Sequence, residues 1–367
     1  MGLKAGIVGL PNVGKSTLFN AITNSHVEAA NYPFATINPN VGSVLVPDER
    51  VDNLSALFNP KRTVYTSFEF FDIAGLVKGA SKGEGLGNQF LAHIREVDAI
   101  IEVVRCFENK DIIHVENSVD PIRDIEIINL ELVMADVETV QNRIGKIAVK
   151  AQVSKEKDSI VEYSALTKVK ALLDNGKAAR TVSLTEEESK VLKNFNLLTM
   201  KPILYVANVG DSDLAEIDSC ENYLKVKEYA AKENAKVIPI CCEVEAELTG
   251  FSKEDKKEFL DSIGAKESGL STLIKESYKL LDLSTFFTVG VDEVRAWTFK
   301  NGMKAPQCAG VIHTDFQKGF IRAEVYSYED LMKYKTEQAL KDAGKIRVEG
   351  KEYIAQDSDI FFFRFNV

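Results

Sequence analysis

The sequence predicts an α/β fold that is interrupted by a helical insert and followed by a small α+β module. Strand-like and helix-like segments alternate over residues 1–126 and resume over 199–283. A helical pattern fills 127–198, and short strand-like segments fill 284–367. A chain of 367 residues is longer than one hydrophobic core usually supports, so we expect several domains.

Short apolar runs supply the strands of the predicted α/β sheet. Near-continuous apolar segments are typical of strands that are buried on both faces of a parallel sheet. A helix is predicted at Lys15–Ile22, a few residues after the first of these runs. The runs are Ala5–Val8, Tyr65–Ile73, Ala99–Val104, Ile203–Ala207 and Lys236–Ile240.

An apolar seam marks the helical insert. Its residues recur at alternating spacings of three and four, which is the a/d pattern of a coiled coil. A break at Asn175-Gly176 divides the region, so we expect a helical hairpin. An amphipathic bundle packed on the sheet would give the same spacing and stays open as an alternative. The seam residues are Leu130, Val133, Val137, Val140, Ile144 and Ile147.

The C-terminal module combines predicted strands with one predicted helix, Leu331–Ala343. Ser284–Val367 carries 12 basic and 12 acidic residues, so the rest of the chain holds the whole net charge of −10. A neutral module can present a local basic face to a partner more easily than an acidic one. The predicted strands are Phe286–Val289, Ala309–Ile312, Phe320–Val325 and Ile360–Phe365.

Composition argues against several classes of protein. The net charge of −10 disfavours global attraction to nucleic acid. No apolar run approaches the roughly 20 residues of a membrane span, so we expect no membrane partner. The five cysteines are never spaced as C-x-x-C, which favours reduced thiols in the cytoplasm over a zinc site or a disulfide framework.

The segment Gly9–Thr17 fits the pattern G-x-x-x-x-G-K-[ST] between a strand and a helix. The glycines of such a loop let backbone N–H groups converge on phosphate oxygens at a helix N-terminus. Lys15 can then reach the β- and γ-phosphates, and Ser16 can ligate Mg²⁺. The segment therefore predicts a P-loop nucleoside triphosphatase that binds a nucleotide and Mg²⁺.

Two further segments fit the γ-phosphate end of such a site. Asp72-Ile73-Ala74-Gly75 follows a strand, so the Asp72 carboxylate can hold Mg²⁺ through water and the Gly75 N–H can contact the γ-phosphate. Thr36, in the loop after the first helix, can complete the Mg²⁺ shell. Leu76 stands where Ras-like GTPases carry a glutamine that orients water, so we expect slow intrinsic hydrolysis or another water-orienting group.

The segment Asn208-Val209-Gly210-Asp211 stands where GTPases usually have Asn-Lys-x-Asp. The asparagine of that motif bonds the purine N7 edge, and the aspartate accepts hydrogen bonds from guanine. Val209 shortens the side chain that covers the base, whereas Asp211 keeps the carboxylate. From the residues alone, guanine therefore remains possible.

With these motifs the chain resembles the YchF/Obg-like ATPase family of P-loop proteins over nearly its whole length. The resemblance implies a Ras-like P-loop domain over 1–126 and 199–283, a coiled-coil insert over 127–198 and a C-terminal TGS domain with a β-grasp shape over 284–367. The most specific segments are Val8–Asn20, Phe71–Asn88, His114–Ile128, Trp297–Val325 and Gly350–Val367.

The resemblance also implies a function and a set of site residues. It implies ATP as the preferred nucleotide, and it implies association with ribosomes, for which we expect the large subunit and an RNA contact. It places the metal at Ser16, Thr36 and Asp72, and the adenine at Asn208 with Val209. The residues implied to hold the phosphates are Asn12, Val13, Gly14, Lys15, Ser16, Thr17 and Gly75.

Two groups are candidates for the role of the missing glutamine. His114 resembles the family's mobile-loop histidine and could position water, with Lys15 as the other catalytic residue. Alternatively, the Asn12 amide oxygen could help bind K⁺ beside the phosphates, where the ion would act in place of an arginine finger. We favour His114, with K⁺ as a helper.

The chain departs from the family at three positions. The family usually has Glu at Asp211, which weakens the adenine assignment, and Gly at Asn117 and Ser358. Asparagine tolerates positive φ, so we expect a mild effect at Asn117 and a rearranged turn at Ser358. An Obg-type GTPase and a non-hydrolysing nucleotide-sensing adaptor remain as alternative functions.

Overall fold

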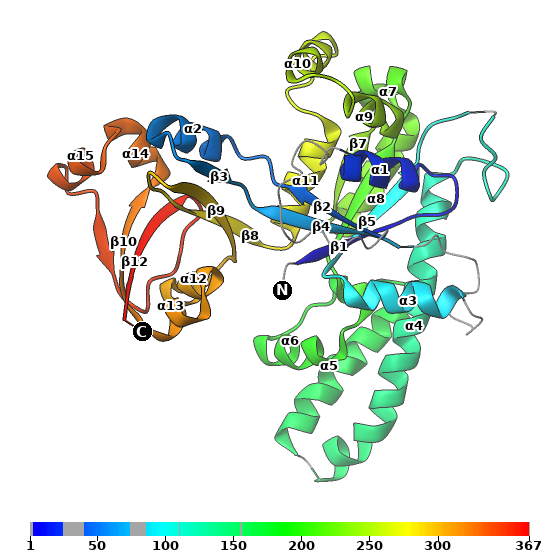
Figure 1. Ribbon diagram of the computed structural model, residues 1–367. Helices are drawn as coiled ribbons and strands as arrows, with labels where there is room; N and C mark the ends of the chain where they lie inside the picture. The colour runs from blue at the N-terminus through cyan, green and yellow to red at the C-terminus, as the bar shows by residue number, and fades with distance from the viewer. Residues whose placement is uncertain (1–2, 25–39, 74–85, 110, 155, 367) are drawn as a thin grey trace. The chain divides into compact units, whose positions relative to one another are not determined.

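The computed structural model describes residues 3–24, 40–73, 86–109, 111–154 and 156–366 (Figure 1). They form two compact units. The first, the nucleotide unit, comprises Met1–Val44 and Glu69–Leu273. The second, the C-terminal unit, comprises Leu45–Phe68 and Ile274–Val367.

The nucleotide unit is built on a six-stranded sheet with the order β2-β4-β1-β5-β6-β7. β1 pairs in parallel with β4 and β5, and β6 pairs in parallel with β5 and β7. Every residue of β5 and β6 is buried, as expected for a sheet with helices on both faces. The strands are β1 (Lys4–Val8), β2 (Val41–Leu45), β4 (Ser67–Asp72), β5 (Ala99–Arg105), β6 (Ile203–Asn208) and β7 (Lys236–Ile240).

Helices cover both faces of this sheet, with α1 and α3 on opposite sides (Figure 1). All five predicted strands of the sheet are present, so the α/β prediction is confirmed. The helices outside the insert are α1 (Lys15–Asn24), α3 (Leu86–Glu96), α7 (Asp211–Ala215), η7 (Ile217–Ser219), α8 (Glu221–Lys232), α9 (Cys242–Leu248), α10 (Lys253–Ser262) and α11 (Gly269–Leu280), the last of which contains the division between the units.

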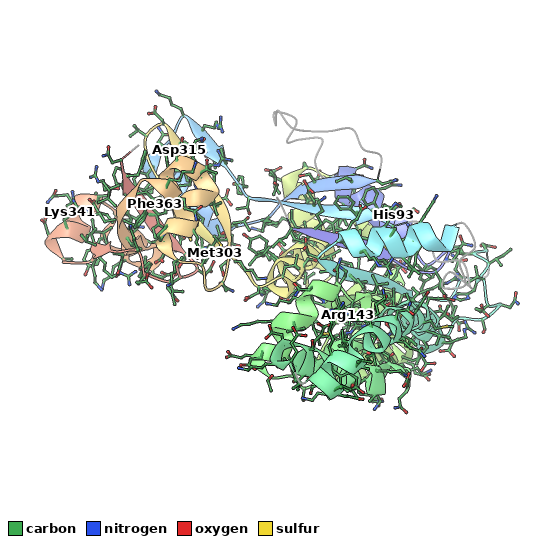
Figure 2. All side chains as sticks on the ribbon, turned by 90° about the horizontal axis from the view of Figure 1, so that it is seen from below. His93, Arg143, Met303, Asp315, Lys341 and Phe363 are labelled. Atoms are coloured by element: carbon green, nitrogen blue, oxygen red, sulfur yellow. The ribbon has the colours of Figure 1, made fainter. Side chains whose placement is uncertain are left out.

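The insert is a hairpin of two helices, α4 (Pro121–Val149) and α5 (Lys157–Leu173), with a π-helical turn η3 (Lys150–Ser154) between them. The chain therefore reverses before the predicted break at Asn175-Gly176, which follows the end of α5. Arg143 of α4, which is labelled in Figure 2, forms an ion pair with Glu162 of α5 across the hairpin. Shorter helices complete it: η4 (Ala179–Thr181), α6 (Glu186–Leu192), η5 (Lys193–Phe195) and η6 (Leu198–Met200).

Five of the six predicted seam residues pack in the core of this hairpin, together with Leu166 and Val169 of α5. Leu130 is the exception, since 53% of it is exposed. The N-terminal part of α4 instead buries Ile128 and Leu132. The helix begins before residue 127 because Asp120 caps it, accepting hydrogen bonds from two backbone N–H groups.

The C-terminal unit has a second six-stranded sheet with the order β11-β10-β12-β8-β9-β3. Its edge strand β3 comes from Leu45–Phe68, the earlier of the two segments of this unit, and pairs in parallel with β9. Helix α2 comes from the same segment, and its Val51 and Leu54 pack against Phe287 and Ile360. The strands are β3 (Arg62–Val64), β8 (Leu283–Thr288), β9 (Glu293–Lys300), β10 (Phe320–Ser327), β11 (Arg347–Glu349) and β12 (Asp359–Phe365).

The helices of this unit are α2 (Glu49–Phe58), α12 (Ala305–Ile312), α13 (Thr314–Lys318), α14 (Tyr328–Tyr334) and α15 (Glu337–Asp342). The predicted strand Ala309–Ile312 is wrong, because these residues end α12. Pro306 stands in the first turn of that helix, and Cys308 and Ala309 bury its apolar face among aromatic residues that include Phe363 (Figure 2).

The predicted helix Leu331–Ala343 is two short helices, α14 and α15. Lys335 separates them in the left-handed conformation, with φ of 66°.

Asn117 and Ser358 also have positive φ, 60° and 69°. The expectation of a rearranged turn at Ser358 is therefore wrong: the serine adopts the conformation that favours glycine. No helix among the described residues is long and apolar enough to cross a membrane.

Candidate functional site

The predicted phosphate-binding loop connects the carboxyl end of β1 to the first residue of α1. Asn12 and Gly14 hold it in a tight turn with positive φ, 63° and 97°. A Cβ atom on Gly14 would lie 2.2 Å from the Asn208 Nδ2 atom, so only glycine fits there. The loop therefore leads into a helix N-terminus, the arrangement that binds phosphate.

Asn208, at the end of β6, fastens this loop to its surroundings. Its Nδ2 donates to the Val13 carbonyl at 2.8 Å, and its Oδ1 accepts from the Cys242 N–H at 3.1 Å. Its own carbonyl accepts from the Cys106 N–H at 2.8 Å. Asn208 thus joins three loops that follow β1, β5 and β7, and its proposed contact with the base stays a prediction.

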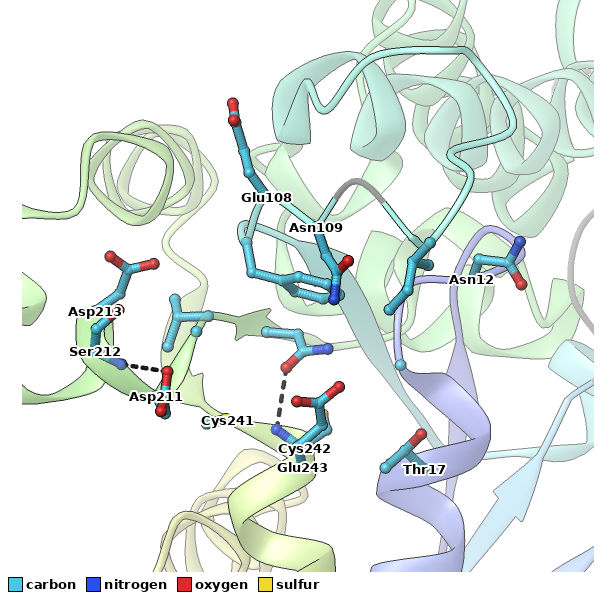
Figure 3. A pocket seen from close by; sticks show the side chains of 16 residues that line it. Asn12, Thr17, Glu108, Asn109, Asp211, Ser212, Asp213, Cys241, Cys242 and Glu243 are labelled. Carbon is cyan, nitrogen blue, oxygen red and sulfur yellow. Dashed lines mark hydrogen bonds between the residues drawn. The ribbon is translucent and has the colours of Figure 1, made fainter.

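A cavity of about 400 Å³ lies beside the loop (Figure 3). It extends from Asn12 and Thr17 at the phosphate loop to Asp211 and Asp213 at the start of α7. The opening of a parallel sheet at the carboxyl ends of its strands is where ligands bind in such folds. Its other lining residues are Gly14, Phe107, Glu108, Asn109, Ile112, Asn208, Val209, Gly210, Ser212, Cys241, Cys242 and Glu243.

The lining of the cavity is acidic at the end away from the phosphate loop. Asp211 is exposed, and its Oδ1 accepts from the Ser212 N–H at 2.7 Å (Figure 3). Val209 is 1% exposed. Carboxylates accept hydrogen bonds from the exocyclic amino groups of both adenine and guanine, so this lining fits either purine.

Lys15 and Asp72 form an ion pair at the other end of the site, with side chains 11% and 24% exposed. A bound polyphosphate would compete with Asp72 for the Lys15 ammonium. The Ser16 residue is exposed on the first turn of α1. A hydroxyl and a carboxylate are hard oxygen donors of the kind that Mg²⁺ takes beside substrate phosphates, so these residues fit the metal.

Two predicted site residues, Thr36 and Gly75, lie outside the described residues, as does Leu76. Among the residues that the structure does describe, no three His, Cys, Asp or Glu side chains gather in a way that could hold a metal ion. A Mg²⁺ site of one or two side chains completed by phosphates does not need such a cluster.

His114 lies in the loop between β5 and α4 and is 5% exposed. Its Nε2 is 2.8 Å from the Asp124 Oδ2, and its Nδ1 accepts from the Glu116 N–H at 3.1 Å. The neighbouring Ile113 carbonyl accepts from the Asn12 Nδ2 at 3.1 Å. The loop therefore reaches the phosphate loop, but both ring nitrogens of His114 are engaged.

Several residues at the site were missed by the sequence analysis. Phe107 follows β5, and Cys241, Cys242 and Glu243 follow β7. A usable signal existed, because the carboxyl ends of neighbouring parallel strands meet at one edge of the sheet. The residues after each predicted strand could have been assigned to the site on that basis.

Comparisons with known proteins agree with this architecture. Residues 4–143 match a family described as 50S ribosome-binding GTPase. Residues 283–366 match the C-terminal family of YchF GTPases, described as a protein of unknown function. The first match covers the N-terminal P-loop segment and runs into α4 of the insert, and the second covers nearly the whole C-terminal module.

Curated relatives match the chain over its full length. It is 58% identical over 367 residues to the ribosome-binding ATPase YchF of Bacillus subtilis, covering 100% of both chains. It is 52% identical over 370 residues to the protein of the same name from Haemophilus influenzae, again covering 100% of both. The structure of the Schizosaccharomyces pombe YchF GTPase superposes with a TM-score of 0.90 at 42% identity, covering 99% of this chain and 98% of that one.

Proposed function

This chain belongs to the YchF family, and from that premise we propose that it is a ribosome-binding ATPase that hydrolyses ATP slowly. The observation that carries the proposal is the phosphate loop, which lines one end of a cavity with Asn12, Gly14 and Thr17, while the other end has a purine-compatible lining. Bacterial relatives with the printed name ribosome-binding ATPase span the whole chain. A cytoplasmic location follows from the proposed partner.

ATP is proposed as the preferred nucleotide because Val209 replaces the lysine of the guanine-specific motif. A GTPase is the second candidate, and two observations favour it. Asp211 keeps the carboxylate that binds guanine, and the S. pombe relative carries the name YchF GTPase. The large ribosomal subunit is proposed as the partner because the N-terminal family description names the 50S ribosome. Contact with its RNA is part of this proposal.

Mg²⁺ is proposed as the cofactor, with Ser16, Asp72 and Thr36 as the residues that hold it. When bound, Mg²⁺ neutralises charge on the phosphate oxygens. The chain's own groups position the nucleotide: backbone N–H groups of the phosphate loop face the phosphates, and the Lys15 ammonium adds a positive charge. Gly75 is proposed to contact the γ-phosphate.

His114 is proposed as the group that positions water, with K⁺ at Asn12 as a helper. In the described conformation one hydrogen bond of the His114 ring would have to open first, to Asp124 or to the Glu116 N–H. A loop movement that frees the ring is compatible with slow turnover. The Asn12 side chain would likewise have to leave the Ile113 carbonyl if its amide is to reorient toward a cation.

The test is hydrolysis and binding by a small set of variants. Lys15→Ala is expected to abolish hydrolysis of ATP and GTP alike, because the charge on the phosphates is lost whatever the base. His114→Ala is expected to lower kcat while leaving nucleotide affinity within about twofold, since only the transition-state interaction is removed. Equilibrium competition between ATP and GTP measures the base preference.

The results of these measurements distinguish the proposed function from its alternatives. Undiminished turnover in Lys15→Ala would place the active site elsewhere in the chain. A strong preference for GTP that disappears in Asp211→Ala would assign the protein to the GTPases. If K⁺ accelerates hydrolysis over Na⁺ and Asn12→Ala removes this difference, the cation contributes as proposed.

A further inference from the structure

Arg105 is the last residue of β5 and is 1% exposed, which is unusual for a charged side chain. Burial lowers the pKa of its guanidinium, while the nearby carboxylates of Asp124 and Glu108 act in the opposite direction. Arginine nevertheless remains charged in proteins. A buried charge of this kind is costly unless hydrogen bonds satisfy it, so its contacts indicate what it does.

The contacts of Arg105 are to backbone carbonyls of one loop. Nε donates to the Phe107 carbonyl at 3.2 Å, Nη2 to the Asn109 carbonyl at 3.1 Å, and Nη1 to the Ile112 carbonyl at 3.1 Å. The guanidinium also lies 4.5 Å from the centre of the Phe107 ring. A single planar side chain therefore holds the loop at Phe107, Asn109 and Ile112, which lysine could not reproduce.

The same three residues, Phe107, Asn109 and Ile112, line the cavity. Val209 and Asp211, which belong to the segment predicted to read the base, line it too. The far end of the loop has a separate attachment, because the Ile113 carbonyl accepts from Asn12 of the phosphate loop. Arg105 is thus placed to shape the wall of the cavity that Phe107, Asn109 and Ile112 form.

We propose that Arg105 is a positioning residue for the nucleotide base, which holds Phe107, Asn109 and Ile112 in the form that walls the cavity that Val209 and Asp211 also line. The inference rests on the proposed function, in which this cavity binds a nucleoside triphosphate. It adds that part of the affinity for the base comes from a loop ordered in advance by a residue that does not touch the nucleotide.

The experiment separates base binding from phosphate binding. In Arg105→Met, the KM and Kd for ATP are expected to rise about tenfold or more, with kcat changed less than about twofold, because binding that is equal in the ground and transition states is what is lost. The affinity for Mg²⁺-tripolyphosphate, measured by inhibition of ATP hydrolysis, is expected to stay the same. Amide hydrogen exchange over 107–112 is expected to accelerate in the nucleotide-free variant.

Arg180→Met, which makes the same substitution as Arg105→Met, is the matched control. Arg180 is a largely buried arginine of the same unit, and it donates to the Lys201 carbonyl and to the Asn129 Oδ1 rather than to the loop. Its substitution is expected to lower Tm and to leave the ratio of ATP affinity to tripolyphosphate affinity unchanged. A change of this ratio in the control would show that general destabilisation suffices.

The inference is overturned if Arg105→Met keeps the parent affinity for ATP, or if it loses affinity for tripolyphosphate as strongly as for ATP. If Arg105→Met does not fold, Arg105→Lys allows the same comparison. Its expected loss is smaller because lysine keeps the charge and can still donate to a carbonyl, although it lacks the planar fork. If instead the parent protein binds neither ATP nor GTP in the presence of Mg²⁺, the proposed function fails.

Discussion

Glu102, in the middle of β5, is a buried carboxyl group without a local partner. It is 1% exposed, and neither of its oxygens has a hydrogen-bond partner among the described residues. Burial raises its pKa well above the ordinary value; the Arg180 charge opposes this shift, whereas Glu233 and Asp124 add to it. The native state therefore favours the neutral form of Glu102 at a pH where the unfolded chain ionises it.

This difference makes the free energy of unfolding depend on pH. Below the unfolded pKa of about 4.3, both states bind the proton and Glu102 contributes no pH dependence. As the pH rises above that value, the unfolded state loses the proton first, so stability falls by about 1.4 kcal/mol per pH unit until the native pKa is reached. Glu102→Gln is expected to remove this loss and to stabilise the protein at pH 7.5 more than at pH 4.5.

Urea unfolding of the parent and Glu102→Gln at both pH values measures the effect. Asp124→Asn tests whether the shift depends on neighbouring carboxylates, because it removes one of the two acidic charges. An equal stability difference between parent and Glu102→Gln at the two pH values would contradict the raised pKa.

Single site residues were predictable where they belong to one motif of neighbouring residues. The loop from Gly9 to Lys15 needs its residue types at fixed spacing, so sequence alone located it. The apolar run Ala99–Val104 indicates a buried strand around Glu102, but the groups that surround Glu102 and Arg105 were not predictable from the sequence. Their roles depend on groups that the fold brings together from later segments, such as Arg180.

At the scale of elements, the spacing of apolar residues correctly predicted a helix in the insert. It did not predict which of those residues are buried along the whole helix. The seam spacing placed most of its residues in the hairpin core, but Leu130 is 53% exposed. The face of α4 that is buried changes along the helix, since Ile128 and Leu132 are buried near its start. A seven-residue repeat carries no information about such a change of partner.

Two substitutions separate the packed part of the seam from its exposed end. Leu166→Ala, on α5, removes a fully buried side chain from the hairpin core and is expected to lower the free energy of unfolding by about 2–5 kcal/mol. Leu130→Ala is expected to change it by less than about 0.5 kcal/mol, since the side chain is mostly exposed. Urea unfolding followed by circular dichroism compares the two; equal losses would mean that Leu130 also packs in the native state.

The predicted strand at Ala309–Ile312 failed for a different reason. Four apolar or small residues fit a strand and a helix equally well, and length and flanking residues must decide. Here a helix begins at Ala305 instead, with Pro306 in its first turn, and Ala305 and Cys308 extend the apolar face toward the start of the helix. The four residues of the predicted strand are too few to show the helical spacing of the apolar residues, which begins at Ala305.

At the scale of the whole molecule, the C-terminal unit is assembled from two distant segments of the chain. Leu45–Phe68 connects strands β2 and β4 of the nucleotide unit, and it contributes α2 and β3 to the C-terminal unit. The sequence placed this segment in the P-loop region because it lies between two of its motifs. Only the pairing of β3 with β9 and the burial of Val51 and Leu54 assign it to the other sheet.

This assembly makes the C-terminal segment difficult to remove cleanly. A chain that lacks residues 284–367 would keep α2 without Phe287 and Ile360, against which Val51 and Leu54 pack, and would leave β3 without its neighbour β9. An exposed apolar helix face and an unpaired edge strand both promote association. If such a chain bound ribosomes more weakly, aggregation would explain the result as well as the loss of a docking surface would.

A double deletion should avoid this problem. The Val46 N–H donates to the Thr66 carbonyl at 2.9 Å, so the two ends of the inserted segment lie side by side and a short Gly/Ser turn can join them. We expect the chain that lacks both 47–65 and 284–367 to be monomeric by size-exclusion chromatography and to bind nucleotide with the parent affinity. The single deletion is expected to associate and to bind a hydrophobic dye. If both truncated chains behave alike, residues 45–68 do not depend on the C-terminal sheet for their burial.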